Sequence, residues 1–265
     1  MGRAVDLGSG ARWWPSAIYQ TTTLEAERDG RRLLVDPGVA PWEIDDVVAG
    51  PDVTEIFLTH ADWDHVLGLG TFPGARVTAS RGAAGRVASG EAAADGVRQG
   101  AGLYVPVRDV EGIRVDRPVD PPAETELGPF AARLLPAPGH TEDGMAAWLA
   151  EPGLLVVGDH LSTLEIPFVN HSAWAYRDTL RALADLIDRE RPRWVVPGHG
   201  RPHDADAAAR LAAEDLAYVD ALVTYAEGGG DPERPEAVPF AARNPDDGAA
   251  HARNVRAACE RAAGG

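Results

Sequence analysis

Short apolar runs separated by turns dominate the first two thirds of the chain, and each run has the length of a β-strand. Residues 18–27 and 31–36 flank Asp29-Gly30, a dipeptide that favours a tight hairpin turn. Further strands are predicted at 53–59, 76–79, 102–107, 131–135, 145–149, 154–157 and 194–196. Residues 81–100 are rich in alanine and glycine and are interpreted as a helix or a covering loop.

Apolar residues three or four positions apart predict helices in the second half of the chain. Residues 176–189 carry Leu180, Leu183, Leu186 and Ile187 at this spacing. Residues 206–227 form a second predicted helix, and 249–262 a short last one. Strands in both halves, each set followed by amphipathic helices, predict an α/β fold of two packed sheets with helices outside. We expect one domain over residues 1–265, with a C-terminal helical tail from about 205.

The composition is that of a soluble globular protein, with 45% hydrophobic and 25% charged residues. A net charge of −16 makes nucleic acid an unexpected partner, because an acidic surface repels phosphates. No apolar run reaches the ~18 residues of a membrane span, and residues 1–17 lack a signal-peptide pattern. We therefore expect a cytoplasmic protein without a membrane partner. The single Cys259 excludes an internal disulfide and thiolates as the main metal ligands.

Carboxylates and imidazoles recur at the ends of the predicted strands. They lie at five places in the chain: Asp36, the segment from His60 to His65, His140, Asp159 and His199. Strand ends project side chains into one rim of a sheet, where several can converge on an ion. Imidazole and carboxylate ligands suit zinc, iron or manganese.

The spacing within the segment His60-Ala61-Asp62-Trp63-Asp64-His65 predicts two metals. Residues two apart in an extended turn point the same way, so His60 and Asp62 are placed to hold one ion. Asp64 and His65 follow as the chain turns into a helix, on the side of a second ion. Two neighbouring ions need a bridging group, and Asp159 is the candidate. Such a pair lowers the pKa of water towards neutrality and stabilises a developing anion.

These motifs resemble the signature of the metallo-β-lactamase superfamily, His-x-His-x-Asp-His followed by a distant His, an Asp and a last His. The chain carries THADWDH, PGHT, GDH and PGHG in that order, and LLVDPG at Asp36 resembles the early Asp-x-Gly turn of the family. The match spans residues 18–204. The resemblance implies a four-layer αββα sandwich.

The resemblance also implies a role for each matching residue. The first metal would be bound by His60, Asp62 and His140, and the second by Asp64, His65 and His199, with Asp159 bridging the two. Asp64 would also orient the attacking hydroxide, which makes it the catalytic candidate. Asp36 resembles a residue that fixes the site from behind the ligands. The expected ions are two divalent metals, zinc first, with manganese or iron as alternatives.

Asp62 stands where most members of the superfamily have histidine. Some relatives share this variant, including the nuclease-like domain of DNA-uptake proteins and choline-phosphate esterases. We expect direct ligation by Asp62, with support of a ligand as the alternative. Two divalent ions give +4, while Asp62, Asp64, Asp159 and a hydroxide give −4, so the centre is neutral instead of +1. This count predicts weaker attraction for anionic substrates and a tilt towards harder metals.

Other polar and aromatic residues near the motifs are given ordinary roles. His160, His171 and His203 are expected to be satisfied surface or rim histidines. Tyr176 and Arg177 open a helix and are expected to be exposed there. Trp13 and Trp14 fall in an N-terminal segment expected to be loose, covering either the pocket or the core.

The expected reaction is hydrolysis of an ester-type bond in a small molecule by a hydroxide that bridges the metals. An ester, lactone or thioester is favoured over a polyanion because of the acidic surface and the neutral centre. A phosphodiester is the first alternative. A mononuclear iron dioxygenase acting on persulfides and a non-catalytic metal-binding module are the alternatives from other classes. Substrate choice is assigned to loops 81–100 and 164–174, and the oligomeric state is left open.

Overall fold

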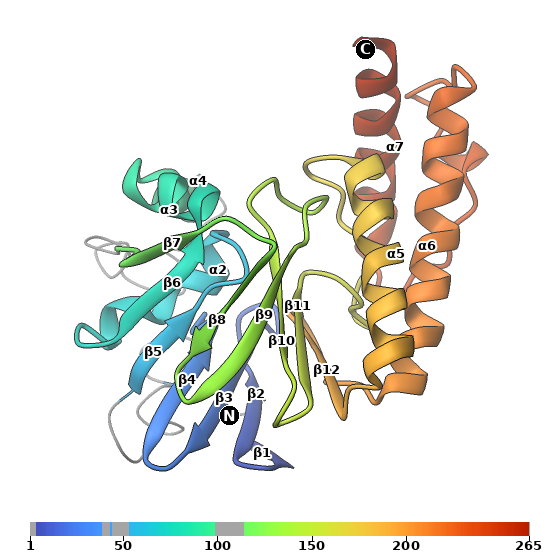
Figure 1. The fold of residues 1–265 in the computed structure, drawn as a ribbon. Helices are drawn as coiled ribbons and strands as arrows, with labels where there is room; N and C mark the ends of the chain where they lie inside the picture. The colour runs from blue at the N-terminus through green and yellow to red at the C-terminus, as the bar shows by residue number, and fades with distance from the viewer. Residues whose placement is uncertain (1–3, 39–42, 44–52, 99–113, 265) are drawn as a thin grey trace.

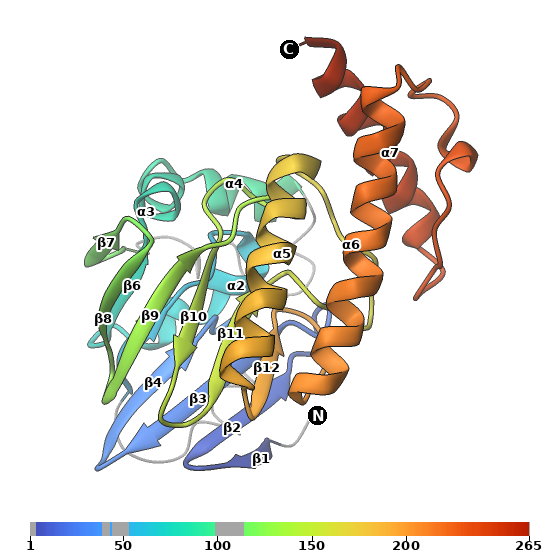
Figure 2. The same cartoon turned by 45° about the vertical axis from the view of Figure 1, so that its right-hand side comes forward.

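Two β-sheets lie face to face with helices on both outer sides, as the computed structural model shows for residues 4–38, 43, 53–98 and 114–264 (Figures 1 and 2). This arrangement confirms the four-layer αββα sandwich. The short helices lie on the outer side of the first sheet, and the long C-terminal helices lie on the outer side of the second (Figure 1).

The first sheet has seven strands in the order β1-β2-β3-β4-β5-β6-β7. The strands are β1 (Val5–Gly8), β2 (Ala11–Pro15), β3 (Thr22–Arg28), β4 (Arg31–Val35), β5 (Val53–Phe57), β6 (Arg76–Ser80) and β7 (Arg117–Val119). The first four are antiparallel, whereas β4 to β7 are parallel to one another. Asp29 and Gly30 both have positive φ at the β3–β4 turn, as the predicted hairpin requires.

The second sheet has five strands in the order β12-β11-β10-β9-β8. They are β8 (Ala123–Leu127), β9 (Phe130–Pro136), β10 (Met145–Leu149), β11 (Leu154–Gly158) and β12 (Trp194–Pro197). The pairing is antiparallel from β8 to β11, and β11 pairs with β12 in parallel. Parallel neighbours end at the same edge of a sheet, so the residues that follow β11 and β12 come together.

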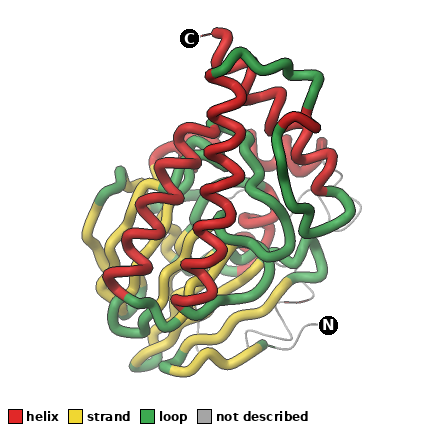
Figure 3. Tube along the Cα trace, turned by 90° about the vertical axis from the view of Figure 1, so that its right-hand side faces the viewer, coloured by secondary structure: helices red, strands yellow, loops and turns green. Residues whose placement is uncertain are grey.

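The helices form the outer layers (Figure 3). On the first sheet they are α2 (Trp63–Val66), α3 (Arg81–Ala88) and α4 (Glu91–Arg98), with a 3-10 turn at Leu67–Thr71. On the side of the second sheet they are α5 (Ala173–Glu190) and α6 (Ala205–Glu227), with α7 (Asp247–Gly264) against α6 and a 3-10 turn at Pro235–Ala237. No helix of the described residues is long and apolar enough to cross a membrane.

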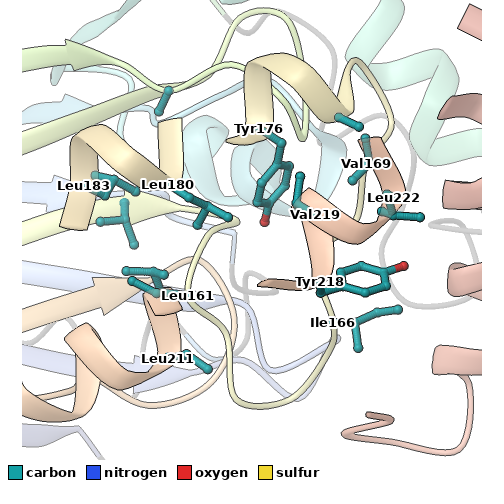
Figure 4. Packing of buried hydrophobic residues seen from close by; sticks show 14 of the residues in the cluster. Leu161, Ile166, Val169, Tyr176, Leu180, Leu183, Leu211, Tyr218, Val219 and Leu222 are labelled. Atoms are coloured by element: carbon teal, nitrogen blue, oxygen red, sulfur yellow. The ribbon is translucent and has the colours of Figure 1, made fainter. Parts of the chain in front are cut away.

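Each pair of adjacent layers encloses its own apolar core. Leu24, Leu33, Phe57, Leu134 and Val156 belong to the core between the two sheets. A second core lies between the first sheet and its helices. The third packs α5 and α6 onto the second sheet and includes Tyr176, Leu180, Leu183, Val219 and Leu222 (Figure 4). Along the central strands β10 and β11 both faces are buried, so polar side chains gather beyond the strand ends, at the rims of the sheet.

The N-terminal segment departs from the prediction. Residues 5–15 form the hairpin β1–β2 instead of a loose covering, and Trp13 and Trp14 on β2 are both buried. Trp13 faces the core between the sheets, and Trp14 faces the core under the helices. The strand lacks the alternation of apolar and polar residues because two layers cover it.

The middle of the chain also adds detail. Residues 81–98 form two helices, α3 and α4, in place of a single helix or loop. Ser80 caps α3, because its hydroxyl accepts a hydrogen bond from the backbone N–H of Ala83 at 3.0 Å. Strands β7 and β8 were not predicted, and the strand predicted at 102–107 lies outside the described residues.

Candidate metal centre

Two histidines of the first motif are positioned by polar contacts of their Nδ1 atoms. The Thr59 hydroxyl donates to Asp36 Oδ2 at 2.6 Å, so it accepts from His60 Nδ1, 3.0 Å away. Asp36 Oδ2 also lies 3.2 Å from His65 Nδ1. Asp36 thus stands behind both imidazoles, and their Nε2 atoms are free to face the rim of the sheets.

The two distant histidines are held in the same way by backbone carbonyls. His140 Nδ1 donates to the carbonyl of Phe168 at 2.9 Å. His199 Nδ1 donates to the carbonyl of Tyr19 at 3.0 Å. Since Nδ1 carries the proton in both rings, Nε2 is the atom left for a metal.

Asp159, which follows β11, lies among all four imidazoles. Its carboxylate oxygens are 3.2 Å from Nε2 of His65, His140 and His199 and 3.6 Å from Nε2 of His60. Ligands of one zinc at about 2.0–2.1 Å lie roughly 3.4 Å apart, so these separations suit shared coordination. The central place of Asp159 is the one expected of a bridging carboxylate.

The remaining carboxylates of the first motif divide between two sides. Asp64 Oδ2 lies 3.6 Å from His65 Nε2 and 3.5 Å from His199 Nε2. Asp62 Oδ2 lies 3.2 Å from His140 Nε2 and 3.8 Å from His60 Nε2. Ligand atoms come within 4.8 Å of one another in three sets. The sets are His60, His140 and Asp159; Asp64, His65 and His199; and Asp159, Glu165 and His199.

Unpaired buried atoms support the fit of metal ions to these residues. Nε2 of His60, Nε2 of His65 and Oδ1 of Asp159 are buried and have no hydrogen-bond partner among the described residues. A buried polar atom without a partner costs free energy unless a further group satisfies it. The imidazole and carboxylate donors suit zinc, iron or manganese. The structure therefore brings together all seven predicted ligands, while ligation itself stays a prediction.

The charges of the centre shift several pKa values. Burial acts to lower the pKa of His140 and of His199, but the charge of Asp159 and hydrogen bonds to carboxylates outweigh it. The pKa of His140 is raised to about 9 and that of His199 to about 10. Burial opposes ionisation of Asp159, yet the imidazoles around it hold its pKa well below the ordinary value. The site without metal thus holds protons where metals would bind.

Arg86 on α3 is a member of the site that the sequence did not reveal. Its Nη2 lies 2.9 Å from Asp62 Oδ1, and its Nη1 lies 3.0 Å from Asp143 Oδ1. The other oxygen of Asp143 accepts the backbone N–H of Ala61 at 2.9 Å. Burial acts to raise the pKa of Asp62, but the hydrogen bond of His140 and the nearby positive charges lower it overall. Asp62 is therefore fixed with one oxygen on Arg86 and one facing the histidines.

The centre forms the floor of a pocket of about 820 Å³. Exposed Tyr19 and buried Trp63 meet edge to face at its wall, with ring centroids 5.6 Å apart. Leu164 and Phe168 add further apolar surface. A concave, partly apolar pocket over convergent polar groups is the usual form of a small-molecule site.

Comparison with known proteins gives the family. The model of the metallo-beta-lactamase superfamily matches residues 19–199. The chain belongs to the metallo-beta-lactamase superfamily. Members of this superfamily bind metal ions and are generally metal-dependent enzymes. A search of curated proteins gives no match.

Solved structures of the superfamily share the fold. A metallo-beta-lactamase family protein from Thermus thermophilus is 23% identical with a TM-score of 0.66, covering 98% of this chain and 95% of its own. The stereoselective inverting sec-alkylsulfatase Pisa1 from Pseudomonas sp. is 14% identical with a TM-score of 0.73, covering 98% of this chain and 50% of its own. The structure of TTHA1623 in a di-iron-bound form is 22% identical with a TM-score of 0.58. The match covers 74% of this chain and 95% of TTHA1623.

Gly198 shows how closely the superfamily motif PGHG is packed here. A Cβ atom on Gly198 would lie 2.0 Å from Asp159 Oδ1 and 2.9 Å from His65 Cε1. Its backbone N–H donates to the carbonyl of Gly158 at 2.7 Å. Only glycine fits between the bridging candidate and the second set of ligands.

The C-terminal segment holds the loop that lines one side of the pocket. Arg243 Nη1 donates to the carbonyls of Ser162 and Glu165 at 2.8 and 2.9 Å. The side chain of Asn254 on α7 accepts the N–H of Val169 at 3.0 Å and donates to the carbonyl of Pro167 at 2.6 Å. The predicted helical tail is therefore part of the pocket wall.

Two residues that the sequence placed at the surface are buried. His160 is 2% exposed, and its Nε2 has no partner among the described residues. Tyr176 is 1% exposed, and its hydroxyl donates to the carbonyl of Asp159 at 2.9 Å. The two rings pack with centroids 4.5 Å apart. They lie between α5 and the loop after β11, so tertiary packing covers what a helix start usually exposes.

His171 and His203 are half-buried and lie outside the ligand sets, as a rim position implies. Nε2 of His203, however, is buried and has no hydrogen-bond partner among the described residues, so this ring is not satisfied as predicted. Arg177 is half-buried as well, instead of exposed.

Proposed function

We propose that this protein is a binuclear metal-dependent hydrolase that cleaves an ester, lactone or thioester bond in a small molecule. The observation that carries the proposal is the position of Asp159, 3.2–3.6 Å from the Nε2 atoms of four histidines at the floor of a pocket. Bound divalent ions would make water a nucleophile near neutral pH and polarise the bond under attack. Zinc is the first expectation, and manganese or iron fits the same donors.

The residues around the ions would position the water and the substrate. Asp64 is held by the Thr21 hydroxyl, which donates to Oδ2 at 2.9 Å, and this contact fixes the carboxylate that we assign to orienting the water. Asp36, behind His60 and His65, would keep both imidazoles aimed at the ions. Tyr19 and Trp63 would pack against an apolar part of the substrate.

We further infer that the substrate carries an acidic group away from the bond that breaks. Arg253 on α7 lines the pocket and is exposed, and it forms no ion pair with any residue in the described ranges. Its guanidinium carbon lies 5.7 Å from the centre of the Phe168 ring. Arg243, the other pocket arginine, is occupied by Asp215 at 2.6 Å. Arg253 is thus the cation available to an incoming carboxylate, phosphate or sulfate.

The positive charge of Arg86 does not make the neutral metal centre attractive to anions. The guanidinium is shared among four carboxylates, at 2.9 Å from Asp62, 3.0 Å from Asp143, 3.3 Å from Glu91 and 3.4 Å from Asp95. Attraction for an acidic substrate would therefore come from Arg253, on the far wall of the pocket from α3.

The experiment is metal analysis followed by substrate panels. Protein purified without added metal is measured by mass spectrometry and then assayed with carboxylic esters, lactones, thioesters, phosphodiesters and sulfate esters. Near two divalent ions per chain, with turnover of a carboxylic ester, lactone or thioester, supports the proposal. One iron per chain with an iron absorption band would favour the oxygenase alternative. Two metals per chain with turnover of phosphodiesters alone would show that the substrate is a phosphodiester and not an ester, lactone or thioester.

A further inference from the structure

One carboxylate beside the centre is not among the seven predicted ligands. Glu165 lies in the loop after β11 and lines the pocket. One of its oxygens, one of Asp159 and one imidazole nitrogen of His199 all lie within 4.8 Å of one another. In the sequence it is the one charged residue of the apolar stretch LSTLEIPFV.

The Glu165 side chain has no structural partner. Within the described ranges its carboxylate accepts no hydrogen bond and forms no ion pair, although the residue is half-buried. Its backbone, in contrast, is fixed, because Arg243 donates to its carbonyl at 2.9 Å and Asn244 donates to that of Leu164 at 2.6 Å. A half-buried carboxylate without a partner destabilises a fold, so a held loop that presents one to a pocket indicates a use for it.

The distances disfavour direct binding of the same ion that Asp159 and His199 would share. Those two lie 3.2 Å apart, which suits one tetrahedral ion. Glu165 forms no ion pair with His199, so its oxygen lies farther from that imidazole than the 3.2 Å of Asp159. Glu165 lines the same pocket as Asp159 and His199, where a hydrogen bond can join it to a substrate atom.

We propose that Glu165 is a catalytic residue that donates a proton to the leaving oxygen or sulfur of the substrate, an inference that rests on the proposed hydrolysis. Water adds its oxygen to the carbonyl carbon and passes a proton to solvent. As the bond from that carbon to the leaving atom breaks, the leaving atom keeps the electron pair and takes the proton of the Glu165 carboxyl. The Glu165 carboxylate then regains a proton from solvent.

In the metal-free protein, the partly buried carboxyl of Glu165 favours its protonated form. Burial raises the pKa of Glu165, and the negative charges of Asp159 and Asp64 act in the same direction. His199 and His140 oppose the shift. Arg243 contacts the backbone of Glu165 and pairs its charge with Asp215, while Arg253 and Asp246 line other parts of the pocket.

The test is the dependence on the leaving group in Glu165→Gln. We expect the turnover of alkyl esters to fall about 100-fold or more, because alkoxides are poor leaving groups, and that of nitrophenyl esters to fall less than about threefold. Metal content by mass spectrometry should stay at the wild-type value. Asp246→Asn removes another carboxylate of the pocket. It should lower the turnover of both esters equally or leave both unchanged.

Two results would overturn the assignment. Equal losses for alkyl and nitrophenyl esters in Glu165→Gln would exclude proton donation to the leaving group. Loss of a metal ion would make Glu165 a ligand. Both are read against an active wild type, so they differ from failure of the proposed function, in which wild-type protein hydrolyses no ester, lactone or thioester.

Discussion

Arg86 Nη2 lies 2.9 Å from Asp62 Oδ1, while Oδ2 of the same carboxylate lies 3.2 Å from His140 Nε2. One oxygen is held by a guanidinium from α3, and the other faces the first set of ligands. The arrangement explains how an aspartate can stand where most of the superfamily has histidine. A short side chain needs an external hold to present a single oxygen to an ion, and Arg86 supplies it.

Arg86→Ala should weaken metal binding at the first set of ligands by about 10–100-fold, because Asp62 loses the contact that orients it. The metal affinity of Arg86→Lys should lie between those of the wild type and Arg86→Ala. A lysine ammonium keeps the charge but lacks the forked guanidinium that reaches both Asp62 and Asp143. The measurement is competitive metal titration with a chromophoric chelator. Arg81→Ala is the control, since Arg81 is on the same helix and pairs with exposed Asp120. Wild-type affinity in Arg86→Ala would refute the role.

Asp36→Asn should lower metal affinity by about 10–100-fold and destabilise the metal-free protein by about 1–3 kcal/mol. The amide keeps one acceptor for the N–H of Thr59 but turns a donor towards His65 Nδ1, which also needs an acceptor. Urea unfolding with a chelator present measures the second effect. Asp29→Asn, at a turn where φ is positive and asparagine is tolerated, is the matched control. An Asp36→Asn variant with unchanged metal affinity would contradict the prediction.

Metal binding near pH 7.5 should release up to about three protons per chain. The pKa values of His140 and His199 are raised from 6.5 to about 9 and about 10, and that of His65 is raised well above 6.5, so all three hold protons that a metal must displace. Affinity should therefore fall as the pH is lowered. Titration calorimetry in buffers of different ionisation enthalpy counts the protons. Affinity that is constant across neutral pH would show that these imidazoles are not displaced.

The same pKa values set a stability trend for the metal-free protein. A histidine whose pKa is raised on folding contributes stability that is fully present below about pH 6.5, the unfolded value. That contribution is lost as the pH rises through about 9 to 10. Urea unfolding at about pH 7 and pH 10 should show the loss in metal-free protein and not in metal-loaded protein.

Arg253→Ala should raise KM about 10–100-fold for a substrate with an acidic group and leave a neutral analogue unaffected. A hydrogen bond to a charged group contributes about 1.5–3 kcal/mol, which corresponds to this change in KM. Arg256→Ala, on the same helix and paired with Glu233, is the control. Equal effects on acidic and neutral substrates would place Arg253 outside substrate binding.

Local signals in the chain were enough to predict most strands, the long helices and the seven residues that converge. Asp29-Gly30 has the backbone freedom for a hairpin turn. Leu180 and Leu183 recur at helical spacing. The ligand candidates follow apolar runs, and a turn after a buried strand leaves its first polar side chains at the rim of the sheet.

The distant residues that complete the site could be found only in the folded molecule. Arg86 is 24 positions from Asp62, and Asn254 is 85 positions from the Val169 that it holds. Neither contact leaves a periodic trace, because it depends on how α3 and α7 pack and not on the local backbone. The burial of Tyr176 was missed and the place of Trp13 was left open for the same reason, since the layers that cover them come from elsewhere in the chain. Local sequence specifies an element, whereas packing chooses its neighbours.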